Sequence, residues 1–101
     1  MATQTALIIP ADSNAPVREV TYQDRDSLKT MQEAVGGWIV PCPGLKMDAY
    51  ANDNGFAERL PFNRRISVAI RDTYPSGILG DVIIPKLTPT KRAKLEKMGL
   101  L

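Results

Sequence analysis

The sequence predicts an α+β domain with a mainly antiparallel sheet of about five or six short strands, one central helix, a short second helix and a C-terminal helix. Short apolar or alternating segments recur between turn residues along the 101-residue chain, and each is typical of a strand. Helical spacing recurs in only three places, whereas a parallel sheet would need a helix between every pair of strands. The length suits a single domain over residues 1–101.

The first third of the chain predicts a hairpin followed by the central helix. Residues 5–10 form a β-branched apolar run ended by proline, residues 12–14 are turn formers, and residues 16–22 form a second strand with mixed faces. Asp24 is a suitable helix cap, after which apolar residues recur at three- and four-residue steps up to Val35. Gly36 and Gly37 then end the helix, because glycine accepts the left-handed conformation.

The middle of the chain predicts three more strands. Residues 38–40 form a strand that Pro41 and Pro43 terminate, and residues 45–52 alternate between apolar and polar side chains. Asn54-Gly55 is the strongest tight-turn signal in the sequence, because this pair tolerates positive φ at both central positions. We therefore expect the chain to reverse there into a return strand over residues 56–60.

The last third predicts two helices around one strand. Residues 64–71 fit either a strand or a helix, and Asn63 as an N-cap favours the helix. Residues 78–85 contain a buried strand, and Thr88-Pro89 is a cap followed by a first helical residue. We expect a basic C-terminal helix over residues 86–101. Its apolar stripe is thin, so this helix can be mobile relative to the rest of the domain.

Charge is distributed unevenly along the chain. The net charge is +2, but residues 86–101 carry five cations against one carboxylate, which leaves −2 on the first 85 residues. Such an asymmetry suits either a solvated helix face or a nucleic-acid-binding surface that combines the tail with Arg64 and Arg65. The acidic body argues against a broad phosphate footprint.

Histidine is absent and Cys42 is the only cysteine. These absences exclude Ser-His-Asp and Cys-His nucleophilic catalysis, histidine-based metal sites and an intramolecular disulfide. Cys42 lies between prolines, without the basic neighbour of a reactive thiol, so we expect a structural role. We expect no cofactor, no bound metal and no enzymatic activity.

Five segments together resemble a family of small uncharacterised proteins from actinobacteria and their phages, over about residues 5–85. The segments are ALIIP, AVGGWI, YANDNGF, LPFNRR and LGDVII, and family members show a related V-N-E-E-G turn, an L-P-x-N-x-x-A segment and a G-D strand. This chain departs from the family at Ile66-Ser67, where members usually have Ala-Thr. The resemblance implies a phage or mobile-element accessory protein, a class that often blocks host defence complexes or sequesters nucleotide signals.

The principal candidate site combines a turn, a helix start and paired guanidinium groups, which together suit a nucleotide-like anion. Its candidate residues are Asn52, Asn54, Asn63, Arg64, Arg65 and Asp81. The alternative for the asparagines is a purely structural role as turn and cap residues, with the arginines facing water.

A second hypothesis is a protein–protein inhibitor that acts through exposed aromatic residues, with a host defence protein or a second copy of the chain as partner. Its candidates are Trp38, Tyr50, Phe56 and Phe62. We expect Trp38 and Phe62 to be core residues instead. No apolar run reaches the length of a membrane span and no secretion signal is evident, so we expect a cytoplasmic protein without a membrane partner.

Overall fold

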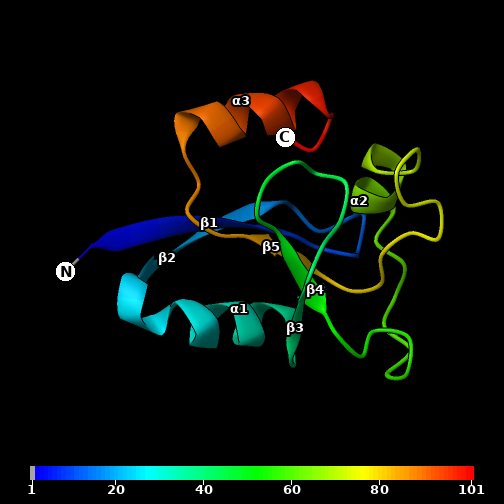
Figure 1. The fold of residues 1–101 in the computed structure, drawn as a ribbon, viewed down its shortest axis with the longest axis horizontal. Helices are drawn as coiled ribbons and strands as arrows, with labels where there is room; N and C mark the ends of the chain where they lie inside the picture. Colours follow the sequence, from blue (N-terminus) through cyan, green and yellow to red (C-terminus); the bar gives the residue numbers. More distant parts are fainter. Residues whose placement is uncertain (1) are drawn as a thin grey trace.

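The computed structural model describes residues 2–101 and contains five strands and three α-helices, confirming the α+β class (Figure 1). The order is β1 (Thr3–Ile9), β2 (Arg18–Gln23), a 3-10 turn (Asp24–Asp26), α1 (Ser27–Val35), β3 (Ile39–Pro41), β4 (Tyr50–Asn52), α2 (Arg64–Ala69), β5 (Val82–Ile84) and α3 (Pro89–Lys97).

All neighbouring strands of the sheet are antiparallel, in the order β2-β1-β5-β4-β3. The predicted β1–β2 hairpin is present, with Ala6 opposite Val20. The last strand in sequence, β5, lies in the middle of the sheet, where it joins the hairpin to β4. Strands β2 and β3 are therefore the two edges of the sheet.

Alternation along β1 produces two cores, one on each face of the sheet. Ala6 and Ile8 pack in a cluster with Val35 of α1, whereas Leu7 and Ile9 pack with residues of α2 and α3 such as Ile66. Figure 1 shows α1 and α3 on opposite sides of the sheet accordingly. The C-terminal helix is anchored in the second core, because Leu95 and Leu100 are buried there.

Helix ends follow the sequence signals in three of four cases. Gly36 ends α1 with φ of 79°, and the side chain of Asn63 accepts a hydrogen bond from the Ile66 amide at the start of α2. Thr88 caps α3 in the same way. The prediction that Asp24 caps α1 is wrong: Asp24 begins the 3-10 turn, and the residue at the cap position of α1 is Asp26, whose side chain makes no capping hydrogen bond.

Two of the predicted strands are wrong. Residues 45–49 form a loop, because Lys46 has a φ of 60° and Leu45 turns into the core, so only Tyr50–Asn52 enters the sheet. Residues 56–60 form consecutive turns closed by local backbone hydrogen bonds, among them Leu60 N–H to the Gly55 carbonyl at 2.9 Å. Gly55 is needed for a close approach, since a Cβ there would lie 3.2 Å from the Leu79 carbonyl oxygen.

The side chain of Asn63 joins three separate segments of the fold. It is fully buried, and its amide nitrogen donates to the carbonyls of Ile9 and Gly80, each at 3.0 Å. Its amide oxygen accepts from the Ile66 amide at 3.1 Å. The end of β1, the start of α2 and the approach to β5 are therefore held by one primary amide.

We predict that Asn63→Ala lowers the free energy of unfolding by about 3 to 5 kcal/mol, measured by chemical denaturation. The substitution removes a helix cap worth ~1 kcal/mol and leaves buried backbone groups unpaired at ~1 to 3 kcal/mol each. Asn63→Asp is an equally good cap but cannot donate to the two carbonyls, so we expect a comparable loss. Wild-type stability in Asn63→Asp would contradict this role, and the exposed Asn54→Ala is the matched control, expected within ~0.5 kcal/mol of wild type.

The thiol of Cys42 is buried in the core that includes Leu45 and Ile70, and burial raises its pKa from 9.0 to about 11. The unfolded chain releases this proton near pH 9.0, whereas the folded chain retains it. We therefore predict that the thiol makes the free energy of unfolding fall between pH 9 and 11. Denaturation across this range should show that fall in the wild type and a smaller one in Cys42→Ala; identical pH profiles would refute it.

Candidate functional site

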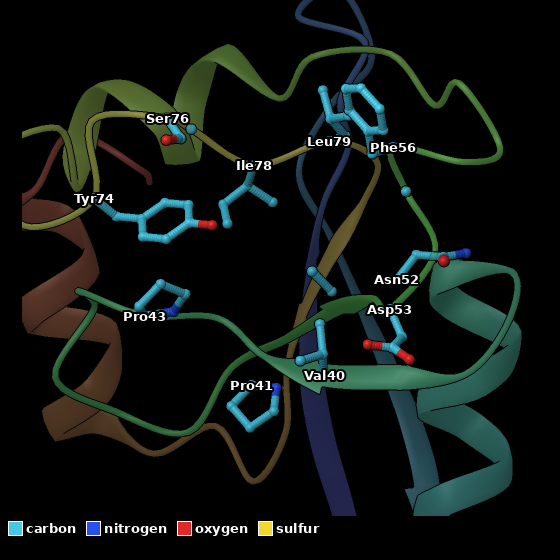
Figure 2. Close-up of a pocket in the computed structure, with 13 residues that line it drawn as sticks. Val40, Pro41, Pro43, Asn52, Asp53, Phe56, Tyr74, Ser76, Ile78 and Leu79 are labelled. Carbon is cyan, nitrogen blue, oxygen red and sulfur yellow. The ribbon is translucent and has the colours of Figure 1, made fainter.

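A groove of about 660 Å³ lies at the β3–β4 end of the sheet (Figure 2). Its floor includes Val40 and Ala51, which are paired across β3 and β4. Its lining residues are Val40, Pro41, Pro43, Ala51, Asn52, Asp53, Gly55, Phe56, Tyr74, Ser76, Gly77, Ile78 and Leu79. A volume of this size falls in the range of ligand-binding pockets, and most of these side chains are apolar or aromatic.

The wall opposite β3 is the segment from Tyr74 to Leu79. In Figure 2, Tyr74 and Ile78 face Pro41, Pro43 and Val40 across the groove. The hydroxyl of Ser67, in α2, accepts a hydrogen bond from the backbone N–H of Ile78 at 2.9 Å. The backbone N–H of Asn63 donates to the Ile78 carbonyl at 2.8 Å. These buried bonds fix the wall to α2 and so pre-form the groove.

The outer edge of β3 carries backbone groups that pair with nothing else in residues 2–101. The Trp38 carbonyl accepts from the Asp53 amide at 2.8 Å, and the Cys42 amide donates to the Ala49 carbonyl at 2.7 Å. The backbone N–H and C=O groups of the even-numbered positions, Val40 included, therefore point towards β4. In an antiparallel ladder the intervening residues point their backbone groups the other way. Ile39 therefore directs its N–H and C=O outwards, and Pro41 directs its C=O outwards.

Aromatic residues are exposed around this groove. Phe56 is 89% exposed and Trp38, which immediately precedes β3, is 70% exposed. The expectation that Trp38 and Phe62 are core residues is wrong, since Phe62 is also 52% exposed. Tyr50 is partly buried and packs against the α1-side core. Trp38 follows Gly37 immediately before a three-residue strand, and Phe62 forms an isolated β-bridge with Leu79. Neither position belongs to a periodic sequence pattern that could separate an exposed ring from a buried one.

Two of the predicted anion-site residues stabilise the turn after β4. The side chain of Asn52 is buried, donates to the Val35 carbonyl at 3.0 Å and accepts from the Asn54 backbone amide at 2.7 Å. Asn54 itself is exposed. The structure thus places Asn52 between the end of α1 and the groove, with its polar atoms engaged internally.

The remaining predicted residues lie around α2 and the start of β5. Asn63 makes the three internal bonds described above, and Asp81 accepts from the Ala11 amide at 2.8 Å. Arg65 donates to the carbonyls of Ser13 and Ala15 in the β1–β2 loop. Arg64 is exposed. Anion binding by this set remains a prediction. The side chains of Asn52, Asn63, Arg65 and Asp81 already make internal hydrogen bonds, and the buried Nη1 of Arg65 has no partner among residues 2–101.

The basic C-terminal helix also uses part of its charge internally. Arg92 pairs with Glu19 on β2, and Lys91 donates to the Pro85 carbonyl at 3.1 Å. Lys86, Lys94 and Lys97 are exposed. These contacts tie α3 to the sheet, and three of the five cations of residues 86–101 face solvent.

Sequence reasoning did not single out Val40, Asp53, Tyr74 or Ile78, which line the groove. Pro41 and Pro43 gave one usable signal, because proline in a strand is confined to sheet edges. Nothing local in the sequence indicates that residues 74–79 pack opposite that edge. Among residues 2–101, no helix is both long and apolar enough to cross a membrane.

Comparison with known proteins identifies a family without a known activity. The family model described as a domain of unknown function, DUF3846, matches residues 4–97. Neither the curated proteins nor the solved structures contain a match to this chain. Because the matched region covers nearly the whole sequence, the chain belongs to the DUF3846 family of uncharacterised domains.

Proposed function

We propose that this chain is a binding protein that holds part of a partner protein in the groove between β3 and residues 74–79. The observation that carries the proposal is the exposure of Phe56 and Trp38 beside a pre-formed apolar groove. Aromatic side chains dominate the energy of protein interfaces, because they bury a large area at small cost in conformational entropy.

The chemistry of the groove favours a protein segment over a nucleotide-like anion. Asp53 is the one charged residue among those that line it, and a carboxylate repels phosphate. Most of the other lining groups are aliphatic, aromatic or proline side chains, which gain free energy by burying apolar surface. This is the inhibitor hypothesis of the sequence analysis, with Val40 and Tyr74 added and with Tyr50 and Phe62 removed, since neither of these two lines the groove.

The biological setting of the proposal comes from the sequence resemblance. We propose that the chain is a phage or mobile-element accessory protein and that its partner belongs to a host defence system. Binding alone would serve this role, because an inhibitor needs only to occupy a surface that the defence protein uses. An exposed groove with a fixed wall supports that mode, since pre-organisation reduces the entropy lost on binding.

We predict that Phe56→Ala and Trp38→Ala each weaken binding of the partner at least ~10-fold, as expected for aromatic anchors. The partner is first co-purified with the tagged wild-type chain from the cells in which this chain is naturally made. The partner is then prepared in pure form, and its affinity for each variant is measured by isothermal titration calorimetry. Because both rings are exposed, thermal unfolding should show both variants folded.

Leu28→Ala is the matched control, because Leu28 is an exposed apolar residue of α1 and does not line the groove. It should leave the affinity unchanged. A partner that binds both aromatic variants normally but is lost from Arg64→Ala would contradict the proposal and favour the arginine-based site.

A further inference from the structure

We infer that the occupant of the groove is an extended segment of the partner that adds to the outer edge of β3 as a sixth strand and carries a lysine or arginine directed towards Asp53. This inference rests on the proposed function and specifies the chemistry of the partner. It follows from three features: the outward backbone groups of β3, the side chains on the groove face of β3, and the carboxylate of Asp53, which follows β4.

The outward backbone of β3 offers one donor and two acceptors. These are the N–H and C=O of Ile39 and the C=O of Pro41, which point away from β4 as derived above. An extended peptide that pairs with Ile39 can exchange two hydrogen bonds with it and donate a third to Pro41. Addition of a strand to an exposed sheet edge is a recurrent mode of peptide recognition, in which the backbone supplies affinity and alternate side chains supply specificity.

Alternation of side chains fixes which peptide residues reach the groove. Val40 lines the groove, so the peptide residue opposite Val40 points to the same face of the sheet. An apolar side chain at that position would be buried against the floor and the Tyr74 wall. The peptide residue two positions away stands opposite Trp38 and also points to the groove face.

The position opposite Trp38 favours a cation. Trp38 and Asp53 are cross-strand neighbours, since the Asp53 amide donates to the Trp38 carbonyl at 2.8 Å. Neighbouring strands lie ~4.8 Å apart, so a side chain from an added strand must cross ~10 Å to reach Asp53. Lysine and arginine are long enough, and on the way the cation would pass the exposed Trp38, which offers the best ring for cation–π attraction.

A second copy of the chain fits the same edge poorly. Residues 36–44, which include β3, contain no lysine or arginine, so a symmetric β3–β3 contact would bring no cation to Asp53. Pro41 also has no N–H to donate, which limits ladder growth between two identical edges. The edge therefore suits a foreign segment that carries the missing charge.

The inference is tested by selecting binders from a displayed library of random 12-residue peptides on the immobilised full-length protein. We expect enrichment of a lysine or arginine two residues from an aliphatic or aromatic residue. Affinity of the enriched synthetic peptide is then measured by fluorescence anisotropy. Asp53→Asn should weaken it 5- to 10-fold, whereas Glu58→Gln, an exposed carboxylate outside the groove lining, should not change it.

Two changes to the peptide complete the test. Norleucine in place of the cation should weaken wild-type binding at least as much as Asp53→Asn does. It should have a smaller effect on that variant than on the wild type, because only the attraction to Trp38 is then left to lose. N-methylation of the residue opposite Ile39 should weaken binding more than 10-fold, because it removes a backbone donor.

Equal affinity of the peptide for wild type and Asp53→Asn, or tolerance of N-methylation, would overturn the inference. If Phe56→Ala still abolished binding of that peptide, the groove would remain the binding site and only the strand-and-cation mode would fail. The inference would also be overturned if the library yielded no enriched sequence, or if analytical ultracentrifugation showed a dimer formed through β3. The calorimetric comparison of the aromatic variants tests the proposed function separately.

Discussion

The buried primary amide of Asn63 is the interaction on which the arrangement of this domain depends. It caps α2 and binds the carbonyls of Ile9 and Gly80, which are 54 and 17 positions away in sequence. Buried backbone carbonyls at strand ends are costly if unpaired, and only a side chain with two N–H donors and one acceptor can satisfy all three groups at once. The same residue fixes the groove wall, since its backbone N–H binds the Ile78 carbonyl. Asn63 therefore stabilises both the fold and the wall of the candidate site.

The groove exists because the sheet ends in a short strand that its own chain leaves partly uncovered. Exposed edges invite aggregation, and proteins commonly protect them with prolines and with very short strands. Strand β3 has three residues, and Pro41 is one of them. These features restrict pairing to a few hydrogen bonds, so that side-chain contacts must decide which segment binds. The short edge of β3 can therefore pair with a segment whose side chains fit the groove, but it cannot form a long, non-specific β-ladder.

The parts of the fold that local chemistry determines were predictable from the sequence. The β1–β2 hairpin follows from alternation and turn residues, and the ends of α1, α2 and α3 at Gly36, Asn63 and Thr88 follow from capping preferences. Asn63 was also selected as a site residue, because a cap next to arginines resembles an anion site. Its two long-range bonds to carbonyls explain its placement structurally, and no local pattern reveals them.

The features that tertiary packing determines could not be predicted. Asn54-Gly55 suggested a hairpin, but the Asn52 side chain engages the Asn54 amide and the chain continues in turns. Alternation over residues 45–52 suggested a long strand, although Leu45 reaches the core from a loop. The groove joins residues 40–56 to residues 74–79, so its existence depends on contacts between segments that no sequence period records.

Native-state hydrogen exchange tests the central claim, that Asn63 holds the α2 start and the groove wall as one rigid unit. The decisive amides are those of Ile66 and Ile78, which bind the side chains of Asn63 and Ser67. We predict that both exchange only through global unfolding, with the same free energy of opening as the amides of the central strand β5. Exchange of either amide through a local opening several kcal/mol below that of β5 would contradict the account.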